Sequence, residues 1–327
     1  MQRLDYIDKL KGMTILLVVM GHLAEHSMDI TTMPFNVMYA SFHMPMFMFL
    51  SGIFAYKAFT DYSLAEIEAW IRKKFLRVIV PFFIVGGFYG LVSTGNPLDV
   101  YIGTIGGYWF LPALFICMFL GLVVNKLSCK FTPPFLTLIV LIAIYGTVCA
   151  AYVSGVRFPY FLHALKMFPY FYLGAMFTKY GKVKRLMTES NNVYSVAALA
   201  VVALFLFRNS LPNTFTFTGL FIIIMLMQVF IKYDTKMPHV LAVVGRYSLE
   251  IYVFHWFFIP AMPGVKAYMG SIPKDFLLPN GNLILMIILT FALSIVIAGV
   301  CIAVAVAIKH SRWLDAVVFG NIKSLKL

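Results

Sequence analysis

The sequence is dominated by apolar segments that carry almost no charge and are separated by short polar connections. A helix needs about 20 residues to cross a hydrocarbon core. Segments near that length cover residues 12–28, 36–56, 78–93, 106–125, 135–153, 161–178, 193–208, 213–231, 245–262 and 283–308. Because backbone amides inside lipid must be bonded within the protein, such segments form helices. The sequence therefore predicts an all-α polytopic membrane protein, a bundle of about ten transmembrane helices in a single domain over residues 1–327.

The composition supports this class and excludes others. The chain is 61% hydrophobic and 12% charged, whereas soluble domains carry about 25% charged residues. A net charge of +13 would suit a nucleic-acid partner, but the basic residues lie in short connections, so we expect no nucleic acid. The four cysteines show neither metal-ligand nor redox spacing. We therefore expect no bound metal and no disulfide framework.

The distribution of basic residues predicts the orientation in the membrane. If successive segments alternate in direction, 21 of the 26 Lys and Arg residues fall on the side of the N-terminus. The other side keeps Arg157, Lys166, Arg208, Lys266 and Lys274. Cytoplasmic loops are enriched in Lys and Arg, so both termini are predicted to be cytoplasmic, with membrane lipid as a partner along the bundle.

Three segments carry more detailed structural predictions. Residues 64–77 have apolar residues at helical spacing and are predicted to lie along the membrane surface as an amphipathic helix. In the second segment Pro45 is predicted to kink the helix, and Ser51 and Gly52 to permit a close helix contact. Residues 106–112, with two glycines before an aromatic run, indicate either an interfacial aromatic belt or a specially shaped backbone.

The stretch from Asp8 to His22 places an ionisable side chain deep in the first helix. No charged residue separates Lys11 from His22. At 1.5 Å per residue, His22 lies about 16 Å beyond Lys11, near the middle of a core roughly 30 Å thick. Such a residue is either functional or bonded to a neighbouring helix, and this stretch alone favours neither.

Two more imidazoles are predicted at similar depth. His43 lies about 10 Å into the second segment and His255 about 15 Å into the ninth. Ser248, Tyr252 and His255 share one helix face, and Glu250 lies on the same segment. Three imidazoles from three helices, together with a carboxylate, predict a polar chamber inside the bundle.

Basic residues mark the cytoplasmic end of this chamber. Lys73 and Lys74 are explained by attraction to anionic lipid. Arg77, at the mouth of a helix, could also bind phosphate through its fork of N–H donors. Both interpretations remain open for Arg72, Arg77 and Lys11.

These motifs together resemble the acyltransferase-3 family of integral-membrane acyltransferases, and most closely its fucose 4-O-acetylase-like sugar O-acetyltransferases. The matching pieces are Asp8-x-x-Lys11-Gly12 with His22 eleven positions after Lys11, FHMPMFMFLSG at 42–52, Arg77-x-x-x-Pro81, YWFL at 108–111, FPYFYLG at 168–174, and SLEIYxxH at 248–255. Each piece alone is weak, but the combination is specific and covers about residues 8–255. One departure is Lys11, where many relatives have Arg, because Lys keeps the charge but loses bidentate binding.

The resemblance implies a reaction and the residues that perform it. The expected donor substrate is cytoplasmic acetyl-CoA or another short acyl-CoA, with no permanently bound cofactor. The expected acceptor is a hydroxyl of a cell-envelope glycan or lipid-linked sugar, in the cytoplasmic membrane of a bacterial-type cell. His22, as general base or acyl carrier, would act with His43, Glu250, Tyr252 and His255.

The remaining expected roles concern binding and orientation. Lys11, Arg72 and Arg77 would bind the CoA phosphates, while Asp8 and Ser248 would orient the reacting groups. A transporter or flippase of a lipid-linked glycan is the competing interpretation, because helices and buried polar groups suit it equally. Such a transporter needs no CoA site, and more often shows an inverted repeat, which this sequence lacks.

The predicted topology can be tested by cysteine accessibility. A cysteine at Lys74, in a background without native cysteines, should be labelled by an impermeant reagent only after the membrane is opened. A cysteine in residues 263–282 should be labelled in intact cells, because this connection is predicted to face outward. Labelling of the Lys74 position from outside would contradict the orientation.

Overall fold

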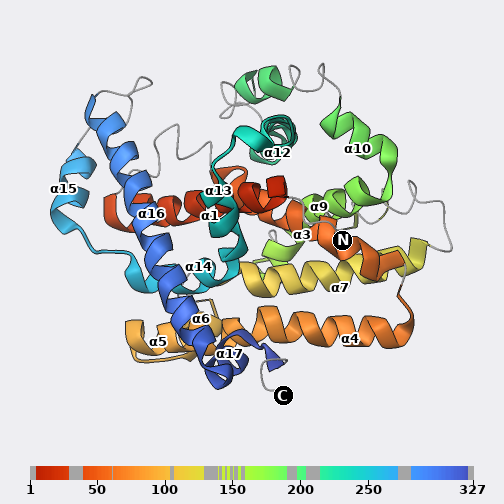
Figure 1. Ribbon diagram of the computed structural model, residues 1–327, viewed down its shortest axis with the longest axis horizontal. Coiled ribbons are helices and arrows are strands. Elements are labelled where there is room, and N and C mark those ends of the chain that lie inside the picture. The colour runs from red at the N-terminus through yellow and green to blue at the C-terminus, as the bar shows by residue number, and fades with distance from the viewer. Residues whose placement is uncertain are drawn as a thin grey trace. The chain divides into compact units, whose positions relative to one another are not determined.

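The computed structural model describes residues 5–28, 40–60, 62–103, 107–128, 139, 142–143, 146–147, 150, 154–155, 159–189, 197–203, 214–271 and 281–322. These residues form helices joined by short connections, and none of them lies in a strand (Figure 1). The all-α prediction is therefore confirmed for the part of the chain that is described. Most of the predicted segment 135–153 and more than half of 193–208 lie outside it.

The chain divides into two compact units. One comprises Met1–Phe47 and Lys182–Val306, and the other Met48–Gly181 and Ala307–Leu327. Three helices contain a boundary between the units, so each begins in one unit and ends in the other. They are α3 (His43–Thr60), α10 (Gly181–Thr188) and α16 (Gly281–His310). The single domain predicted from the sequence stays a prediction.

The first unit is built around α1. Its elements are α1 (Asp5–Leu23), the π-helical turn η1 (Ala24–Met28), α12 (Thr214–Lys232), the 3-10 turn η4 (Asp234–Lys236), α13 (His239–Arg246), α14 (Ser248–Phe254), the 3-10 turn η5 (His255–Phe258) and α15 (Pro263–Ser271). Between Lys11 and His22 helix α1 carries no charged residue, and Leu10, Ile15 and Val19 are fully buried. A helix of this kind belongs in the middle of a bundle. Helix α1 packs mainly on α13, and also on α12 and α14 (Figure 1).

The α1–α13 contact is a backbone contact at two glycines. A Cβ added to Gly12 would lie 2.0 Å from the carbonyl oxygen of Leu241, and one added to Gly245 would lie 1.8 Å from that of Asp8. No side chain larger than hydrogen fits at either position. Small residues bring helices this close in membranes, where van der Waals packing drives helix association.

The second unit uses the same device between α3 and α9. Its elements include α4 (Leu64–Lys74), the π-helical turns η2 (Phe75–Ile79) and η3 (Phe82–Gly86), α5 (Gly87–Thr94), α6 (Leu98–Tyr101), α7 (Phe110–Ser128), α9 (Pro159–Lys179) and α17 (Arg312–Phe319). A Cβ on Gly52 would lie 1.9 Å from the carbonyl oxygen of Phe171, and a Cβ on Gly174 would lie 1.9 Å from that of Phe49. The close approach predicted at Gly52 is confirmed.

Two of the described helices are long and apolar enough to cross a membrane, Leu64–Thr94 and Ile284–His310. Shorter apolar helices cover His43–Tyr56, Phe110–Val124 and Thr218–Lys232. These helices fit a membrane protein, while the number of about ten spans and the cytoplasmic position of both termini stay predictions.

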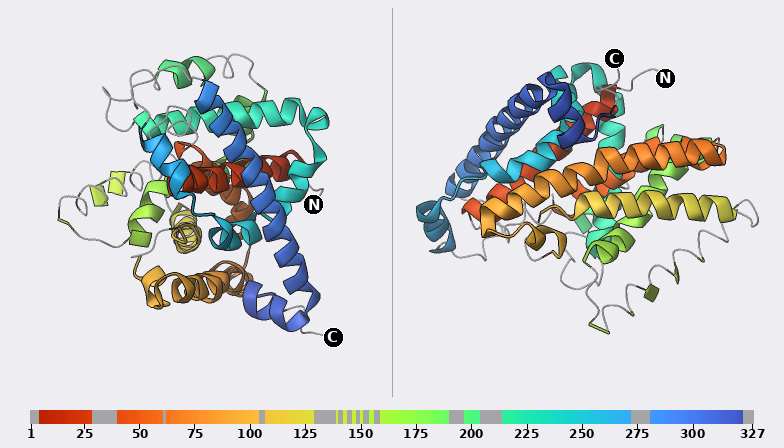
Figure 2. Two further views of the ribbon diagram at one scale, coloured as in Figure 1. Left: turned by 90° about the vertical axis from the view of Figure 1, so that its left-hand side faces the viewer. Right: turned by 90° about the horizontal axis from the view of Figure 1, so that it is seen from below.

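The starts of α3 and α4 bear on two sequence predictions. Helix α3 begins at His43, so Pro45 lies in its first turn, where its missing N–H costs no helical bond. The kink predicted at Pro45 stays a prediction. Residues 64–77 are helical, with Ser63 and Glu66 forming a capping box at the start. However, α4 continues through η2 and η3 into α5 without a loop, as the orange ribbon in the right-hand view of Figure 2 shows. The stretch is therefore the first part of a long helix rather than a separate surface helix.

The ninth predicted segment is interrupted in the structure. It is divided at Tyr247, where φ is −98° and ψ is 15°, between α13 and α14. The chain then tightens into η5 at His255 and becomes extended at Ile259. A single helix over 245–262 was therefore the wrong prediction, and the interruption turns the residues after Tyr247 relative to α13.

Replacing Gly245 by alanine should destabilise the protein, because its Cβ would overlap the backbone of α1. Overpacking of this kind costs about 1–3 kcal/mol, and here the obstacle is backbone rather than a flexible side chain. Thermal unfolding of detergent-purified protein would measure the loss. The matched control is Gly299→Ala in α16, where an added Cβ meets nothing within 4 Å. Equal melting temperatures for the two variants would contradict the proposed contact.

Candidate active site

His22 lies in the last turn of α1, beside two aromatic residues of η5. Its ring centroid is 5.2 Å from that of His255, with the two rings 24° from parallel. The indole of Trp256 lies 4.2 Å from the same imidazole. Two of the three predicted imidazoles are thus in direct contact, and both belong to the first unit.

His255 is fully buried and has a defined tautomer. Its Nδ1 lies 2.8 Å from the carbonyl oxygen of Tyr252 and 3.1 Å from that of Ile251. Because carbonyl oxygens only accept, Nδ1 carries the proton and donates to them. Nε2 is then the acceptor nitrogen, and it is buried without a hydrogen-bond partner. The side chain therefore presents a dry acceptor atom next to His22.

The two elements that carry this pair are held together beyond the rings. The Ser27 hydroxyl in η1 donates to the carbonyl oxygen of Pro260 at 2.6 Å, just after η5. Ala24 and Met28 pack with Met269 of α15. These contacts join the end of α1 to the segment that follows His255. They therefore help to hold His22 and His255 together.

Tyr252, Glu250 and Ser248 all lie on α14. The Tyr252 ring is 5.9 Å from His255, and the side chain is buried. Glu250 is also buried, at 4% exposure. Ser248 is half-buried at the first position of α14. Of the predicted catalytic residues, Tyr252 and His255 share a cluster with His22.

His43 is the first residue of α3 and is half-buried. Its expected depth of about 10 Å was counted from residue 36, which lies outside the described residues, so this depth stays a prediction. His43 belongs to the same unit as His22.

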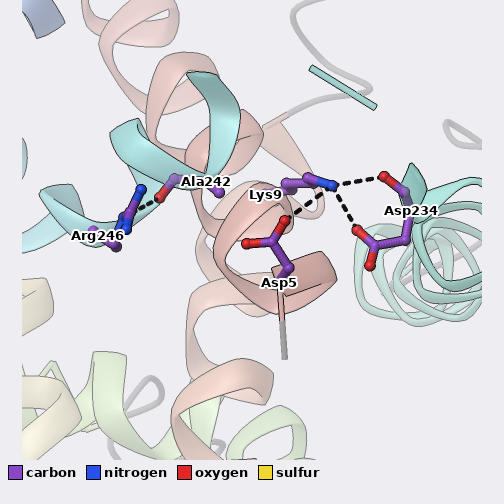
Figure 3. A network of polar contacts seen from close by, with 5 residues as sticks. All are labelled: Asp5, Lys9, Asp234, Ala242 and Arg246. Carbon is purple, nitrogen blue, oxygen red and sulfur yellow. Dashed lines mark hydrogen bonds and ion pairs between the residues drawn. The ribbon is translucent and has the colours of Figure 1, made fainter. Parts of the chain in front are cut away.

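The start of α1 carries a polar network that joins Lys9 to a residue far along the chain. The ammonium of Lys9 donates to a carboxylate oxygen of Asp234 at 2.8 Å and to its carbonyl oxygen at 2.6 Å, and lies 3.1 Å from Asp5 (Figure 3). The hydrogen bond to Asp234 raises the pKa of Lys9 above its usual value, so the ammonium stays charged at neutral pH. The charge on Lys9 would be lost only under strongly alkaline conditions, as the pH rises through that elevated pKa.

The predicted binding residues lie in two different units. Lys11 is 3.8 Å from Asp8, an ion pair in the first turns of α1. Arg246 on α13 donates to the carbonyl oxygen of Ala242 at 3.2 Å (Figure 3). In the second unit Arg72 lies in the last turn of α4 and Arg77 lies in η2, and both are exposed.

The backbone just before α7 adopts an unusual conformation, which agrees with one of the two interpretations of residues 106–112. Gly107 has a φ of +111°, a value that side chains rarely allow. The turn buries Tyr108 and stacks Trp109 on His163 of α9, with ring centroids 4.4 Å apart. His163 was missed by the sequence analysis, because a single histidine inside an apolar run carries no distinctive spacing.

Glu25, His26 and Trp256 were also missed. His26 packs edge-on against Trp256, 5.0 Å between centroids. A carboxylate oxygen of Glu25 lies 3.7 Å from a ring nitrogen of His22 and 3.7 Å from one of His26. The spacing of His22, Glu25 and His26, at i, i+3 and i+4, could have shown that they share one helix face.

Comparison with known proteins identifies the family. A family model described as an acyltransferase domain matches residues 4–299, nearly the whole chain. The chain belongs to the acyltransferase-3 family. This family is one of membrane acyltransferases, which agrees with the long apolar helices and supports acyl transfer as the activity. Searches of curated proteins and of solved structures gave no match. The likeness to fucose 4-O-acetylases stays a prediction.

A substitution of His255 can separate the role of its donor Nδ1 from that of its acceptor Nε2. In His255→Asn the amide nitrogen can replace Nδ1 as donor to Tyr252, but nothing replaces Nε2. We expect normal folding and a loss of transfer of about 10²-fold, the lower end of general acid–base effects. Transfer assays on purified protein would measure it, with the exposed His239→Asn as control. If His255→Asn stays fully active, the buried Nε2 has no part in the reaction.

Proposed function

We propose that this acyltransferase moves an acetyl or other short acyl group from cytoplasmic acyl-CoA to a hydroxyl of a cell-envelope glycan or lipid-linked sugar. The observation that carries the proposal is the stack of His22 on the buried His255. Family membership supplies the reaction class, and the imidazole pair supplies a group suited to it. The acceptor and the acyl-CoA donor rest on the resemblance described above.

The chemistry needs a base near a dry site. A sugar hydroxyl is a weak nucleophile, and a positioned imidazole takes its proton as the oxygen attacks the thioester carbonyl. The new C–O bond forms, the C–S bond breaks, and the protonated imidazole returns its proton to the leaving CoA thiolate. His22 suits this role, because it is partly exposed, at 22% of its side chain, while His255 behind it is fully buried.

Other polar groups of the first unit are assigned supporting roles. The developing oxyanion needs hydrogen-bond donors in a site from which water is excluded. Tyr252, Ser248 and His43 carry suitable donors, and Glu250 would orient one of the imidazoles. Asp8 is assigned to Lys11, with which it forms an ion pair.

Donor binding is assigned to basic residues. Lys11, Arg72 and Arg77 would hold the CoA phosphates, to which guanidinium groups bind through paired N–H donors. Both arginines are exposed, as residues that meet a soluble donor must be. Lipid anchoring remains the alternative role for the same charges.

The first test is His22→Ala. We expect the variant to fold, insert and bind acyl-CoA, but to lose about 10²–10⁴-fold in transfer, as is typical when a general base is removed. Acetyl transfer and acyl-CoA binding would be measured on the same purified samples. The exposed His310→Ala serves as control, since it alters a histidine at the end of α16. Near-normal transfer by a well-folded His22→Ala protein would refute the proposal.

A rapid-quench experiment separates direct from covalent transfer. Wild-type protein mixed with labelled acetyl-CoA and no acceptor becomes labelled if an imidazole or hydroxyl first takes the acyl group. The label should then be absent in His22→Ala. Unlabelled wild-type protein, with activity lost only in the variant, indicates direct attack by the acceptor hydroxyl.

Arg77→Ala tests donor binding. Loss of one charged hydrogen-bond partner costs about 1.5–3 kcal/mol, or roughly 10- to 150-fold in affinity. The defect should appear mainly in acyl-CoA binding and should diminish when donor is saturating. Lys73→Ala is the matched control, because Lys73 is an exposed cation one turn away on α4. If calorimetry gives the same affinity for both variants, Arg77 is a lipid anchor.

A further inference from the structure

Three side chains with metal-ligating atoms converge where α1 passes into η1. His22, Glu25 and His26 each offer one donor atom, and these atoms all lie within 4.8 Å of one another. Within the described part of the chain, no other group of three or more His, Cys, Asp or Glu side chains meets this condition. Their spacing of i, i+3 and i+4 puts them on one helix face.

The distances within this group are those of ligands rather than of hydrogen-bond partners. Nδ1 of His22 and Nε2 of His26 each lie 3.7 Å from Oε2 of Glu25, which is too long for a hydrogen bond. Nδ1 of His22 is buried and has no hydrogen-bond partner. Ligands of a tetrahedral zinc ion at 2.0–2.2 Å lie about 3.4 Å apart, so small side-chain rotations would bring these atoms to ligand spacing.

The surroundings allow an ion to enter. The side chains of Glu25 and His26 are 58% and 47% exposed, and that of His22 is 22% exposed. The π-helical turn Ala24–Met28 carries two of the three residues, and turns of this kind occur frequently at functional sites. Trp256 packs against both imidazoles, with ring centroids 4.2 Å from His22 and 5.0 Å from His26.

We propose that His22, Glu25 and His26 form a binding site for a divalent transition-metal ion of the zinc class. Two imidazoles and one carboxylate suit zinc, copper or nickel, whereas magnesium and calcium prefer oxygen ligands alone. Such a set leaves a fourth position for water or another small ligand. The cysteine spacing predicted no metal site, but the ligands proposed here are two histidines and a carboxylate.

The site has a regulatory consequence that rests on the proposed function. A metal ion on Nδ1 of His22 leaves the proton on Nε2, so the imidazole no longer has a free nitrogen to accept a proton. Binding of the ion should therefore inhibit acyl transfer. His255 stacks on His22 but is not one of the three ligands.

Metal binding is tested without any acyl substrate. Purified protein stripped with chelator is titrated with Zn²⁺ against a competing chelating dye, and with Co²⁺, whose visible spectrum reports the ligand geometry. We expect one ion per chain, with affinity lowered at least 10-fold in His26→Ala and in Glu25→Gln, since even outer-shell changes at metal sites cost about 10–100-fold. The controls are His310→Ala and Glu68→Gln, both exposed. Equal affinity in all five proteins would overturn the site.

Inhibition is tested separately, in zinc-buffered transfer assays. Each protein is compared with its own metal-free rate, so that any direct effect of a substitution cancels. Wild type should lose activity as free Zn²⁺ rises, and His26→Ala should require at least 10-fold more. Zinc that binds with one-to-one stoichiometry but leaves transfer unchanged overturns the inhibitory role. Absence of transfer under every condition tells against the proposed function, and the binding titration still decides the metal site.

Discussion

The contact between the backbones of α1 and α13 at Gly12 and Gly245 determines where the histidines meet. His22 follows Gly12 by ten residues, and His255 follows Gly245 by ten. Helix α1 continues unbroken from Gly12 to His22, about 15 Å along its axis, while the other segment breaks at Tyr247 and tightens at His255. The glycine contact holds the two segments together just before that break, and both histidines lie ten residues beyond it. The 5.2 Å stack of the two imidazoles is the result. A side chain at either glycine would force the helices apart at the point that sets this register.

Polar contacts at both ends of α1 reinforce the same alignment. Near its start, Lys9 binds Asp234 in the turn that precedes α13. Just beyond its end, Ser27 binds the carbonyl oxygen of Pro260. Each contact joins α1 to a segment adjoining the helices that carry His255, so the register does not depend on packing alone. The glycines supply proximity, and the polar groups oppose sliding along the helix axis.

The sequence predicted those features that depend on local spacing. The meeting of His22 and His255 agrees with the expected polar chamber, while their depth in the membrane stays a prediction. The helix at residues 64–77 and the close approach at Gly52 likewise follow from periodicity and residue size. The start of α3 could not be predicted, because an apolar segment does not reveal the first residue of its helix, and Pro45 lies in that first turn. The break at Tyr247 has no local signal of this kind.

Other features could not be predicted, because they join distant parts of the chain. Lys9 and Asp234 are 225 positions apart, and each alone looks like an ordinary loop charge. Trp256 looks like one more aromatic residue in an apolar run until the fold sets it against His22. Glu25 and His26 differ from these, since their spacing from His22 is local. The depth of His22 in the membrane does not reveal them, whereas the helix face that they share with His22 does.

The position of His22 between two environments explains why its chemistry needs control. On one side lies His255, which is fully buried. On the other lie Glu25 and His26, which are about half exposed. A general base must be shielded from water so that it takes its proton from the acceptor. It must also be accessible enough for the acceptor hydroxyl to reach it. That opening also admits other species that bind neutral imidazole, and metal ions are foremost among them. A carboxylate placed beside such an imidazole strengthens the attraction for cations, so access for the acceptor and exposure to metal arise from the same geometry.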